Sequence, residues 1–244
     1  MDQILILLFF YFLILYSIMG YGKIFTLINS NYQASSFDGL LGLALLIFIS
    51  YLTNIFSPHD YLHNSIIILF GLIVFVYDFR QNFSKRRKEL RDLTIIFSII
   101  FMGLLMYKNH DDFFYYHFPY TIILTEFEKV FGLGNLNHGF RTPSSIFYLN
   151  SLFYLPGIKY FFLNGAAVYI FGFSNFVLYN VIKDQLVKKD FNHILFLSLL
   201  SLLYINTTFP RLSEHGTDRS ALILIFLMSI FYLKSLNYEK KKLD

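Results

Sequence analysis

The sequence predicts an all-α membrane protein, a polytopic bundle of about seven transmembrane helices. Its composition is 56% hydrophobic, 20% aromatic and only 15% charged, and the mean hydropathy is +0.53. A soluble chain of 244 residues needs more charge than this to cover its surface. The apolar residues are also gathered into long runs, and a single run in lipid must satisfy its own backbone hydrogen bonds, which favours helices.

Seven apolar segments are candidate spans. A span needs roughly 20 apolar residues, or about 17 at the least. The third, fourth and seventh segments are shorter than that and would need flanking polar residues to complete them. The first lacks the basic start and small-residue cleavage site of a signal peptide, so we expect a retained helix. The segments are 3–19, 40–56, 65–77, 93–107, 160–182, 191–208 and 221–233.

The distribution of Lys and Arg predicts the orientation of the bundle. Fourteen of the 20 basic residues fall on one set of connections, which includes the run 85–88. Such a run is typical of a topology determinant on a short cytoplasmic loop, with an anionic-lipid contact as the alternative and no nucleic-acid partner expected. The segment 108–150 then faces away from the cytoplasm. We therefore divide the chain into N-terminal helices with a basic loop, 1–92, and a module that carries the outer loop, 93–244.

Two adjacent carboxylates, Asp111 and Asp112, directly follow the fourth apolar segment. A carboxylate at this interface can act as a general base when its surroundings tune its pKa. The alternative is a pair of solvated charges that ends one helix or caps the next. The residues alone leave both interpretations open.

An aromatic run, 113–118, follows the carboxylates and predicts an amphipathic helix in the membrane interface. His117 can donate to a phosphate or titrate near neutral pH, whereas Tyr115 and Tyr116 are typical of an aromatic belt. Pro119 suits the first turn of a following helix. A further apolar piece, 146–155, is too short to cross a membrane and predicts a re-entrant or interfacial helix.

A glycine-punctuated loop, 132–141, comes next. It lacks the spacing of a dinucleotide fingerprint, so its glycines more plausibly allow a sharp turn or close approach to a ligand. Arg141 and His138 together can hold a phosphate. A divalent metal on Asp111, Asp112, His117 and His138 is conceivable, but the spacing matches no known ligand signature. The chain has no cysteine, and no cofactor is predicted.

A second polar segment, 209–220, faces the same side as Asp111. Arg211 and Arg219 can converge with the first loop on one aqueous face, as a transferase site requires. The alternative is a connecting loop in which Asp218 and Ser220 cap the last helix.

These features in this order resemble bacterial membrane glycosyltransferases of the GT-C type. The resemblance covers residues 105–155: the acidic pair 111–112, the aromatic stretch ending in Tyr-His at 116–117, Gly-Leu-Gly-Asn-Leu at 132–136 and Pro-Ser-Ser at 143–145. It implies inverting transfer from a polyprenyl-phosphate sugar donor outside the bacterial cytoplasmic membrane, in envelope glycan assembly. It makes Asp111 or Asp112 the catalytic base. The implied substrate-binding residues are Tyr116, His117, Asn135, His138, Arg141, Arg211 and Arg219.

Other functions stay open beside this resemblance. An O-antigen-type polymerase uses similar substrates but usually has larger, arginine-rich outer loops. A transporter of lipid-linked glycans predicts ionisable residues inside the spans, and the seven marked segments contain essentially none. An inactive or partial membrane protein, completed by a partner subunit, is the remaining alternative.

Overall fold

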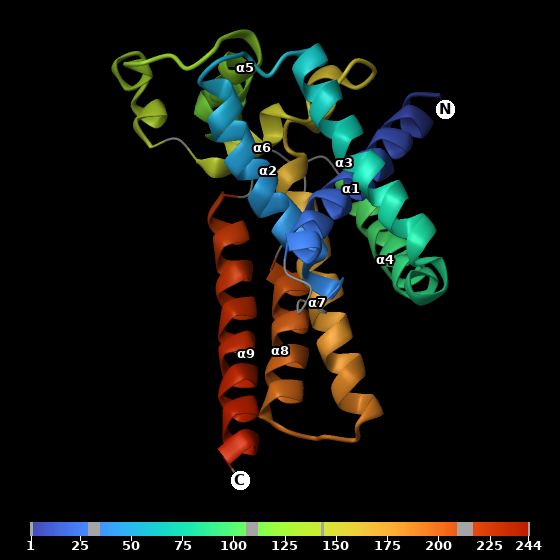
Figure 1. The fold of residues 1–244 in the computed structure, drawn as a ribbon. Helices are drawn as coiled ribbons and strands as arrows, with labels where there is room; N and C mark the ends of the chain where they lie inside the picture. The colour runs from blue at the N-terminus through green and yellow to red at the C-terminus, as the bar shows by residue number, and fades with distance from the viewer. Residues whose placement is uncertain (1, 29–34, 106–111, 143, 209–216, 244) are drawn as a thin grey trace.

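The computed structural model describes residues 2–28, 35–105, 112–142, 144–208 and 217–243, drawn in colour in Figure 1. Helices make up 85% of the structure, and no strand occurs in these ranges, which confirms the predicted all-α class. The longer helices are α1 (Asp2–Ile28), α2 (Asp38–Asn54), α3 (Tyr61–Gln81), α4 (Phe83–Leu104), α5 (Phe118–Glu126), α6 (Ser145–Ser151), α7 (Gly165–Val187), α8 (His193–Thr208) and α9 (Thr217–Leu243). Short 3₁₀ or π turns are η1 (Ser35–Phe37), η2 (Phe113–His117), η3 (Leu133–Asn135), η4 (His138–Arg141) and η5 (Lys159–Phe162).

Four described stretches are long and apolar enough to cross a membrane, fewer than the seven predicted: Gln3–Phe25, Tyr61–Gln81, Lys159–Val187 and Thr217–Leu236. The third and seventh apolar segments are completed by flanking polar residues, as predicted. Polar residues flanking them continue the helices, so α3 has 21 residues and α9 has 27. The short apolar helices are instead α2, with 17 residues, and α8, with 16.

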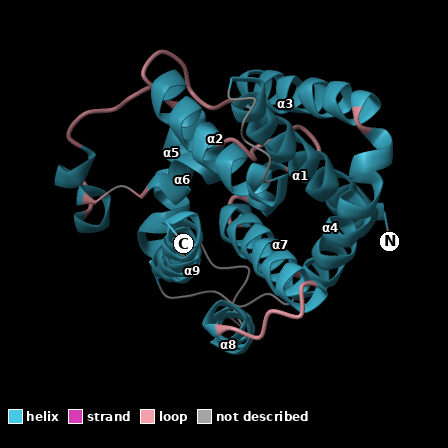
Figure 2. Cartoon of the chain, turned by 60° about the horizontal axis from the view of Figure 1, so that its bottom comes forward, coloured by secondary structure: helices cyan, strands magenta, loops and turns pink. Residues whose placement is uncertain are grey.

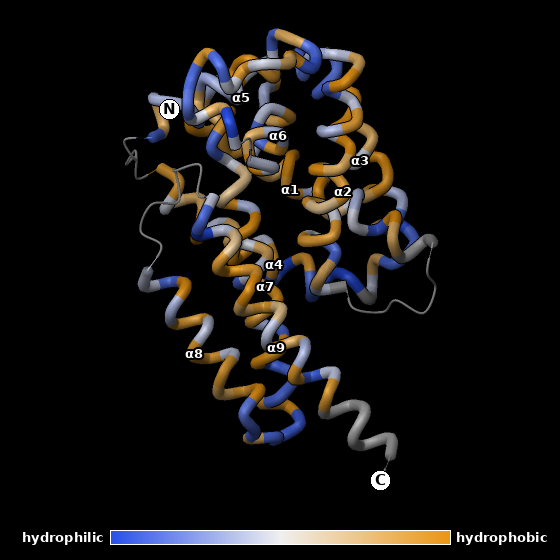
Figure 3. Tube along the Cα trace, turned by 90° about the vertical axis from the view of Figure 1, so that its left-hand side faces the viewer, coloured by the Kyte–Doolittle hydropathy of each residue, from blue (hydrophilic) through white to orange (hydrophobic). Residues whose placement is uncertain are grey.

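The two ends of the molecule carry different parts of the chain. The N-terminus, α5 and α6 lie at one end, and the C-terminus and the α7–α8 connection lie at the other (Figure 1). Hydrophobic residues line the helices between them, while hydrophilic residues gather at connections such as that between α7 and α8 (Figure 3). This arrangement agrees with the predicted grouping of the loops into two sets.

Helix α7 is the centre of the core. In its most apolar window 94% of the residues are buried, and α2, α4, α6, α8 and α9 all contact it (Figure 2). Tyr169 of α7 stacks on Tyr11 of α1 with ring centroids 5.5 Å apart and donates to its backbone oxygen at 2.9 Å. Tyr11 in turn donates to the Phe97 carbonyl of α4 at 3.0 Å. Each buried hydroxyl is thus satisfied by a neighbouring helix.

Helices α1 and α3 approach each other through glycine. A side chain at Gly20 would place its Cβ 1.8 Å from the Gly71 carbonyl oxygen, so no larger residue fits without moving the backbone. Small residues at such crossings are common where two membrane helices pack closely. The Ser17 hydroxyl of α1 donates to the Ile68 carbonyl of α3 at 2.8 Å and adds a polar link to this contact.

A buried network of charges joins the last turns of α1 and α3 to the first turns of α2 and α4. Lys23 and Asp38, 2% and 0% exposed, form an ion pair. Arg86 approaches Asp38 at 3.4 Å, Asp78 at 2.8 Å and Glu89 at 3.6 Å. These charged residues all lie outside the seven marked apolar segments, because the helices extend beyond the apolar runs that marked them.

A second ion pair joins α4 to α7. Lys183 donates to Asp92 Oδ2 at 2.7 Å, and Arg91 donates to Oδ1 at 2.9 Å. Burial alone would raise the pKa of Asp92, but these two cations hold it below its usual value. The predicted domain boundary after residue 92 thus falls inside α4, at a residue that links α4 to α7.

Helix α6 occupies the predicted 146–155 segment. Residues 146–151 are all buried in protein, so α6 is packed inside the bundle rather than spread over its surface. Asn150 accepts a hydrogen bond from the Ala166 N–H at 2.8 Å and so satisfies a donor in the first turn of α7. Through this bond α6 leads into α7, as the sequence predicted for a short piece feeding the next helix.

Candidate functional site

The segment that the sequence predicts to face outward, called the outer segment below, is attached to the bundle at the α2–α3 corner. The His59 N–H donates to the Leu124 carbonyl at 2.8 Å, and the Lys129 N–H donates to the Asn54 carbonyl at 2.7 Å. The Asn54 side chain donates to the Phe127 carbonyl at 3.2 Å. These three bonds fix the end of α5 and the start of the loop that follows it.

The aromatic run after Asp112 forms a π turn, η2, where the sequence predicted an ordinary amphipathic helix. The Phe118 N–H donates to the Phe113 carbonyl, five residues back. Phe113 and His117 are buried, while Phe114 and Tyr115 are 62% and 59% exposed. Pro119 lies in the first turn of α5, as predicted. Because single π turns recur at functional sites, η2 marks this stretch independently of any motif.

Tyr116 brings the two outer segments together. Burial raises the pKa of Tyr116, and the carboxylates of Asp112 and Asp218 raise it further. Asp218 lies in the first turn of α9, so the described end of the second polar segment, 217–220, acts electrostatically on Tyr116. A phenol in this negative surrounding keeps its proton and suits donation to a sugar oxygen better than contact with a phosphate.

Gly139 holds the Tyr116 ring in place. A Cβ at Gly139 would lie 2.4 Å from Tyr116 Cγ, so the ring rests directly on the glycine backbone. Asn137 accepts from the Gly139 N–H at 2.9 Å and donates to the Tyr115 carbonyl at 3.2 Å. Gly139 therefore serves close packing against a side chain, a role different from the sharp turn or ligand approach that the sequence suggested.

His117 is 7% exposed and lies among aromatic rings. Its ring centroid is 4.3 Å from that of Tyr116 and 5.0 Å from that of Phe147. Neither His117 nor His138 lines any of the three cavities described below. The role of His117 in binding a phosphate therefore stays a prediction.

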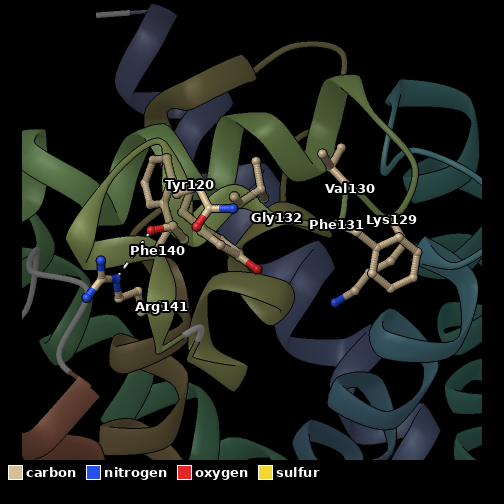
Figure 4. A pocket seen from close by; sticks show the side chains of 10 residues that line it. Tyr120, Lys129, Val130, Phe131, Gly132, Phe140 and Arg141 are labelled. Atoms are coloured by element: carbon tan, nitrogen blue, oxygen red, sulfur yellow. Dashed lines mark hydrogen bonds between the residues drawn. The ribbon is translucent and has the colours of Figure 1, made fainter.

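A shallow polar cavity of about 470 Å³ lies under the glycine-rich loop (Figure 4). Arg141 and Lys129 contribute its two cations, and no carboxylate lines it. Arg141 Nε donates to the Gly134 carbonyl at 3.3 Å, and Lys129 Nζ donates to the Tyr148 hydroxyl at 2.9 Å. Arg141 shares this cavity with Lys129, and its predicted pairing with His138 stays a prediction. The lining residues are Tyr120, Lys129, Val130, Phe131, Gly132, Leu133, Gly134, Asn135, Phe140 and Arg141.

A larger, mostly apolar cavity of about 690 Å³ lies between the start of α1, the end of α4, η2 and η5. Three aromatic side chains that follow Asp112 form part of its wall: Phe113, Phe114 and Phe118. Its polar groups include the exposed Lys159 and the buried Asn164. The η2–α5 segment therefore separates two cavities, because it gives Phe118 to the apolar one and Tyr120 to the polar one.

The remaining predicted residues are placed only in part. Asp111 and Arg211 lie outside the described residues. Asp112 is half-buried at the start of η2, and Arg219 is half-buried in the first turn of α9. Within the described ranges no three His, Asp or Glu side chains gather as a metal centre requires, so Asp112, His117 and His138 do not form one together.

A comparison with protein families gives one match, which extends over residues 4–244. The matching model is described as a domain of unknown function, DUF8201. The chain belongs to the DUF8201 family. No curated protein and no solved structure matches it.

The structure places two lysines, Lys129 and Lys159, in cavities that the sequence did not indicate. Lys129 joins the polar cavity only because the α2–α3 corner binds its backbone, a contact between residues far apart in the chain. Lys159 joins the apolar cavity from η5, where its backbone has a positive φ of 44°. That rare conformation for a side-chain-bearing residue is a recurrent mark of functional positions.

Proposed function

We propose that this DUF8201 chain is a glycosyltransferase of the GT-C kind in a bacterial cytoplasmic membrane. In this proposal α2, α4 and α8 complete a bundle of seven spans with the four longer apolar stretches. The end that carries α5 and α6 faces away from the cytoplasm. The donor is a sugar linked to a polyprenyl phosphate, and the product belongs to an envelope glycan, lipid or protein.

The observation that carries the proposal is the apolar cavity beside Asp112. A volume of about 690 Å³ suits several isoprene units, and aromatic walls suit an unsaturated hydrocarbon chain. Lys159 supplies a cation for the phosphate at the head of such a lipid. Since Phe113 and Phe114 immediately follow Asp112, a lipid held there presents its head group close to the carboxylate.

The proposed step is an inverting displacement. The carboxylate of Asp112 or Asp111 accepts the proton of an acceptor hydroxyl, whose oxygen attacks the anomeric carbon of the sugar. The bond from that carbon to the phosphate oxygen breaks, and its electron pair leaves with the polyprenyl phosphate. Lys159 stabilises the charge that develops on the phosphate.

In this proposal the sugars bind in and near the polar cavity. Lys129 and Arg141 attract an anionic group, and Tyr116 offers a hydroxyl that stays protonated. In the proposal these residues orient the sugars, while Asp112 and Lys159 act at the bond that is exchanged. Positioning of this kind contributes much of the rate in reactions that join two substrates.

The test is binding and transfer with the purified full chain in nanodiscs, with a polyprenyl-phosphate hexose as donor. We expect Lys159→Gln to weaken donor binding about tenfold, the usual size of one lost charge-assisted contact. Asp112→Asn should leave binding within about twofold and lower transfer. Lys188→Gln, an exposed lysine at the opposite end, is the matched control. Donor binding that is equally tight in all three variants would exclude this cavity as the donor site.

A transporter of lipid-linked glycans is the second candidate, and the buried charges favour it. Lys23, Asp38 and Arg86 place ionisable groups inside the helices, as transport sites require. Proteoliposomes with a fluorescent lipid-linked sugar distinguish the two functions. Translocation that stops in Asp38→Asn and continues in Asp112→Asn would favour transport over transfer.

A further inference from the structure

Four residues on α4 form a stripe along one face of the helix: Arg87, Arg91, Ile95 and Ile99. They are spaced by four, so they lie one above the other. Together with Leu90, Thr94 and Ser98 they line a cavity of about 470 Å³, and none of its described lining residues carries a carboxylate. The basic residues are at one end of the groove and the aliphatic ones at the other.

The groove opens to the outside of the bundle. Ile95 and Ile99 are 53% and 68% exposed, whereas Phe97 on the opposite face of α4 is fully buried. Helix α4 lies at the edge of the molecule, with α7 on its inner side (Figure 2). In a membrane this face contacts lipid rather than water.

The charges of the groove are arranged to receive an anion. Arg87 is exposed and forms no ion pair with any residue in the described ranges. Arg91 is oriented by Asp92, which also binds Lys183, and its side chain is still 65% exposed. The anion would therefore meet one guanidinium that is unpaired and a second that is held in position.

The floor of the groove is effectively apolar although it contains two hydroxyls. Thr94 Oγ1 donates to the Leu90 carbonyl at 2.7 Å, and Ser98 Oγ donates to the Thr94 carbonyl at 2.8 Å. With their protons used inside the helix, these side chains do not require a polar ligand. A hydrocarbon chain can lie across them without leaving a donor unsatisfied.

The dimensions fit one leaflet of a bilayer. At about 1.5 Å per residue, the stripe from Arg87 to Ile99 is about 18 Å long. Half of a bilayer hydrocarbon core is about 15 Å thick. When the arginines lie at the level of the phosphates, Ile95 and Ile99 therefore lie beside the acyl chains.

We propose that this groove is a binding site for an anionic phospholipid of the leaflet that faces the basic connections. The phosphate lies between Arg87 and Arg91, where guanidinium groups can hold it with paired hydrogen bonds. One acyl chain follows Ile95 and Ile99. The site is distinct from the proposed transfer site, since its arginines lie near the start of α4 and it shares no lining residue with the cavity beside η2.

The test measures lipid preference on the purified full chain by native mass spectrometry. The chain is offered equimolar phosphatidylglycerol and phosphatidylcholine with identical acyl chains. We expect the wild type to retain phosphatidylglycerol with about fivefold to tenfold preference, as one or two charge-assisted contacts provide. Arg87→Gln should remove most of that preference.

Two further variants distinguish lipid binding in the groove from a general attraction of anionic lipid by the basic residues nearby. Lys88→Gln removes the same charge from a neighbouring exposed residue that does not line the groove, and should keep the preference. Ser98→Phe fills the groove with its arginines intact, and should lose it. Equal retention of both lipids by the wild type, or equal loss in Lys88→Gln and Arg87→Gln, would overturn the proposal. So would a lipid-free dimer that Ser98→Phe disrupts, since the occupant would then be a second copy.

Discussion

His59 and Ser151 are joined by a hydrogen bond of 2.6 Å between Nδ1 and Oγ, across 92 residues of sequence. His59 is fully buried, and its Nε2 lies 3.1 Å from the Ser50 carbonyl oxygen. The ring of His63 stacks on it with centroids 4.9 Å apart. This contact fixes the α2–α3 corner to α6, and the corner in turn holds the outer segment.

The burial of His59 predicts a pH-dependent stability. Desolvation lowers its pKa from 6.5 to about 3, with a smaller contribution from His63 and an opposing one from the Ser50 carbonyl. The unfolded chain therefore binds a proton between pH 6.5 and 3 that the folded chain does not. The contribution of neutral His59 to the free energy of unfolding is fully present above pH 6.5. It is lost as the pH decreases through this window, by on the order of 4 kcal/mol at pH 3.

The measurement is the melting temperature in detergent as a function of pH. We expect His59→Gln to flatten the decline between pH 6.5 and 4, whatever its absolute melting temperature. His138→Gln, at an exposed histidine of η4, should keep the slope of the wild type. A wild-type slope in His59→Gln would show that other groups cause the acid sensitivity.

The network around Asp38 predicts a large effect from the loss of one charge. Asp38→Asn leaves Lys23 buried without its carboxylate partner and weakens the contact with Arg86. Removal of one member of a buried ion pair costs about 3–5 kcal/mol. Thermal unfolding should report this loss, while Asp184→Asn, an exposed carboxylate on α7, should change stability by less than about 0.5 kcal/mol. Equal melting temperatures for the two variants would mean that the network does not stabilise the bundle.

The helices could be predicted from hydropathy, but their ends could not. Helix α3 begins four residues before the marked segment because Asp60 accepts from the His63 N–H at 2.8 Å. An aspartate in that place is a local capping signal that a window of hydropathy averages away. Asn64, which lies between Asp60 and the apolar run, is buried by a contact with the distant α6, in which its Nδ2 donates to the Ser151 carbonyl at 2.8 Å.

The candidate site was less predictable because its parts meet only in the folded chain. Asp112 and Tyr116, four residues apart, could be found by residue type. An effect of Asp218 on this stretch was expected because the two polar segments were predicted to face the same side. No local pattern indicates that Phe113 to His117 form a π turn, or that Lys129 shares a cavity with Arg141. Those placements depend on the α2–α3 corner, which is set by bonds between residues far apart in sequence.

The close contact of Tyr116 with Gly139 gives a prediction about function rather than stability. Gly139→Ala would place a methyl group 2.4 Å from Tyr116 Cγ, so the ring must leave its present position. Small displacements of positioning groups cost about 10- to 100-fold in rate. We expect sugar transfer by the proposed reaction to fall by that factor, measured at a temperature at which the variant is folded.

A double-mutant cycle shows whether the effect acts through Tyr116. In a Tyr116→Ala background the added methyl group meets no ring, so Gly139→Ala should cause no further loss of transfer. Leu136→Ala, at a leucine that is 79% exposed in the same loop, is the control for a general disturbance of the segment. If the losses from Gly139→Ala and Tyr116→Ala multiplied instead, the glycine would act on the site by another route. Because Asp218 at the start of α9 acts electrostatically on Tyr116, non-additive losses would tie this tyrosine and its contact with Gly139 directly to the chemistry.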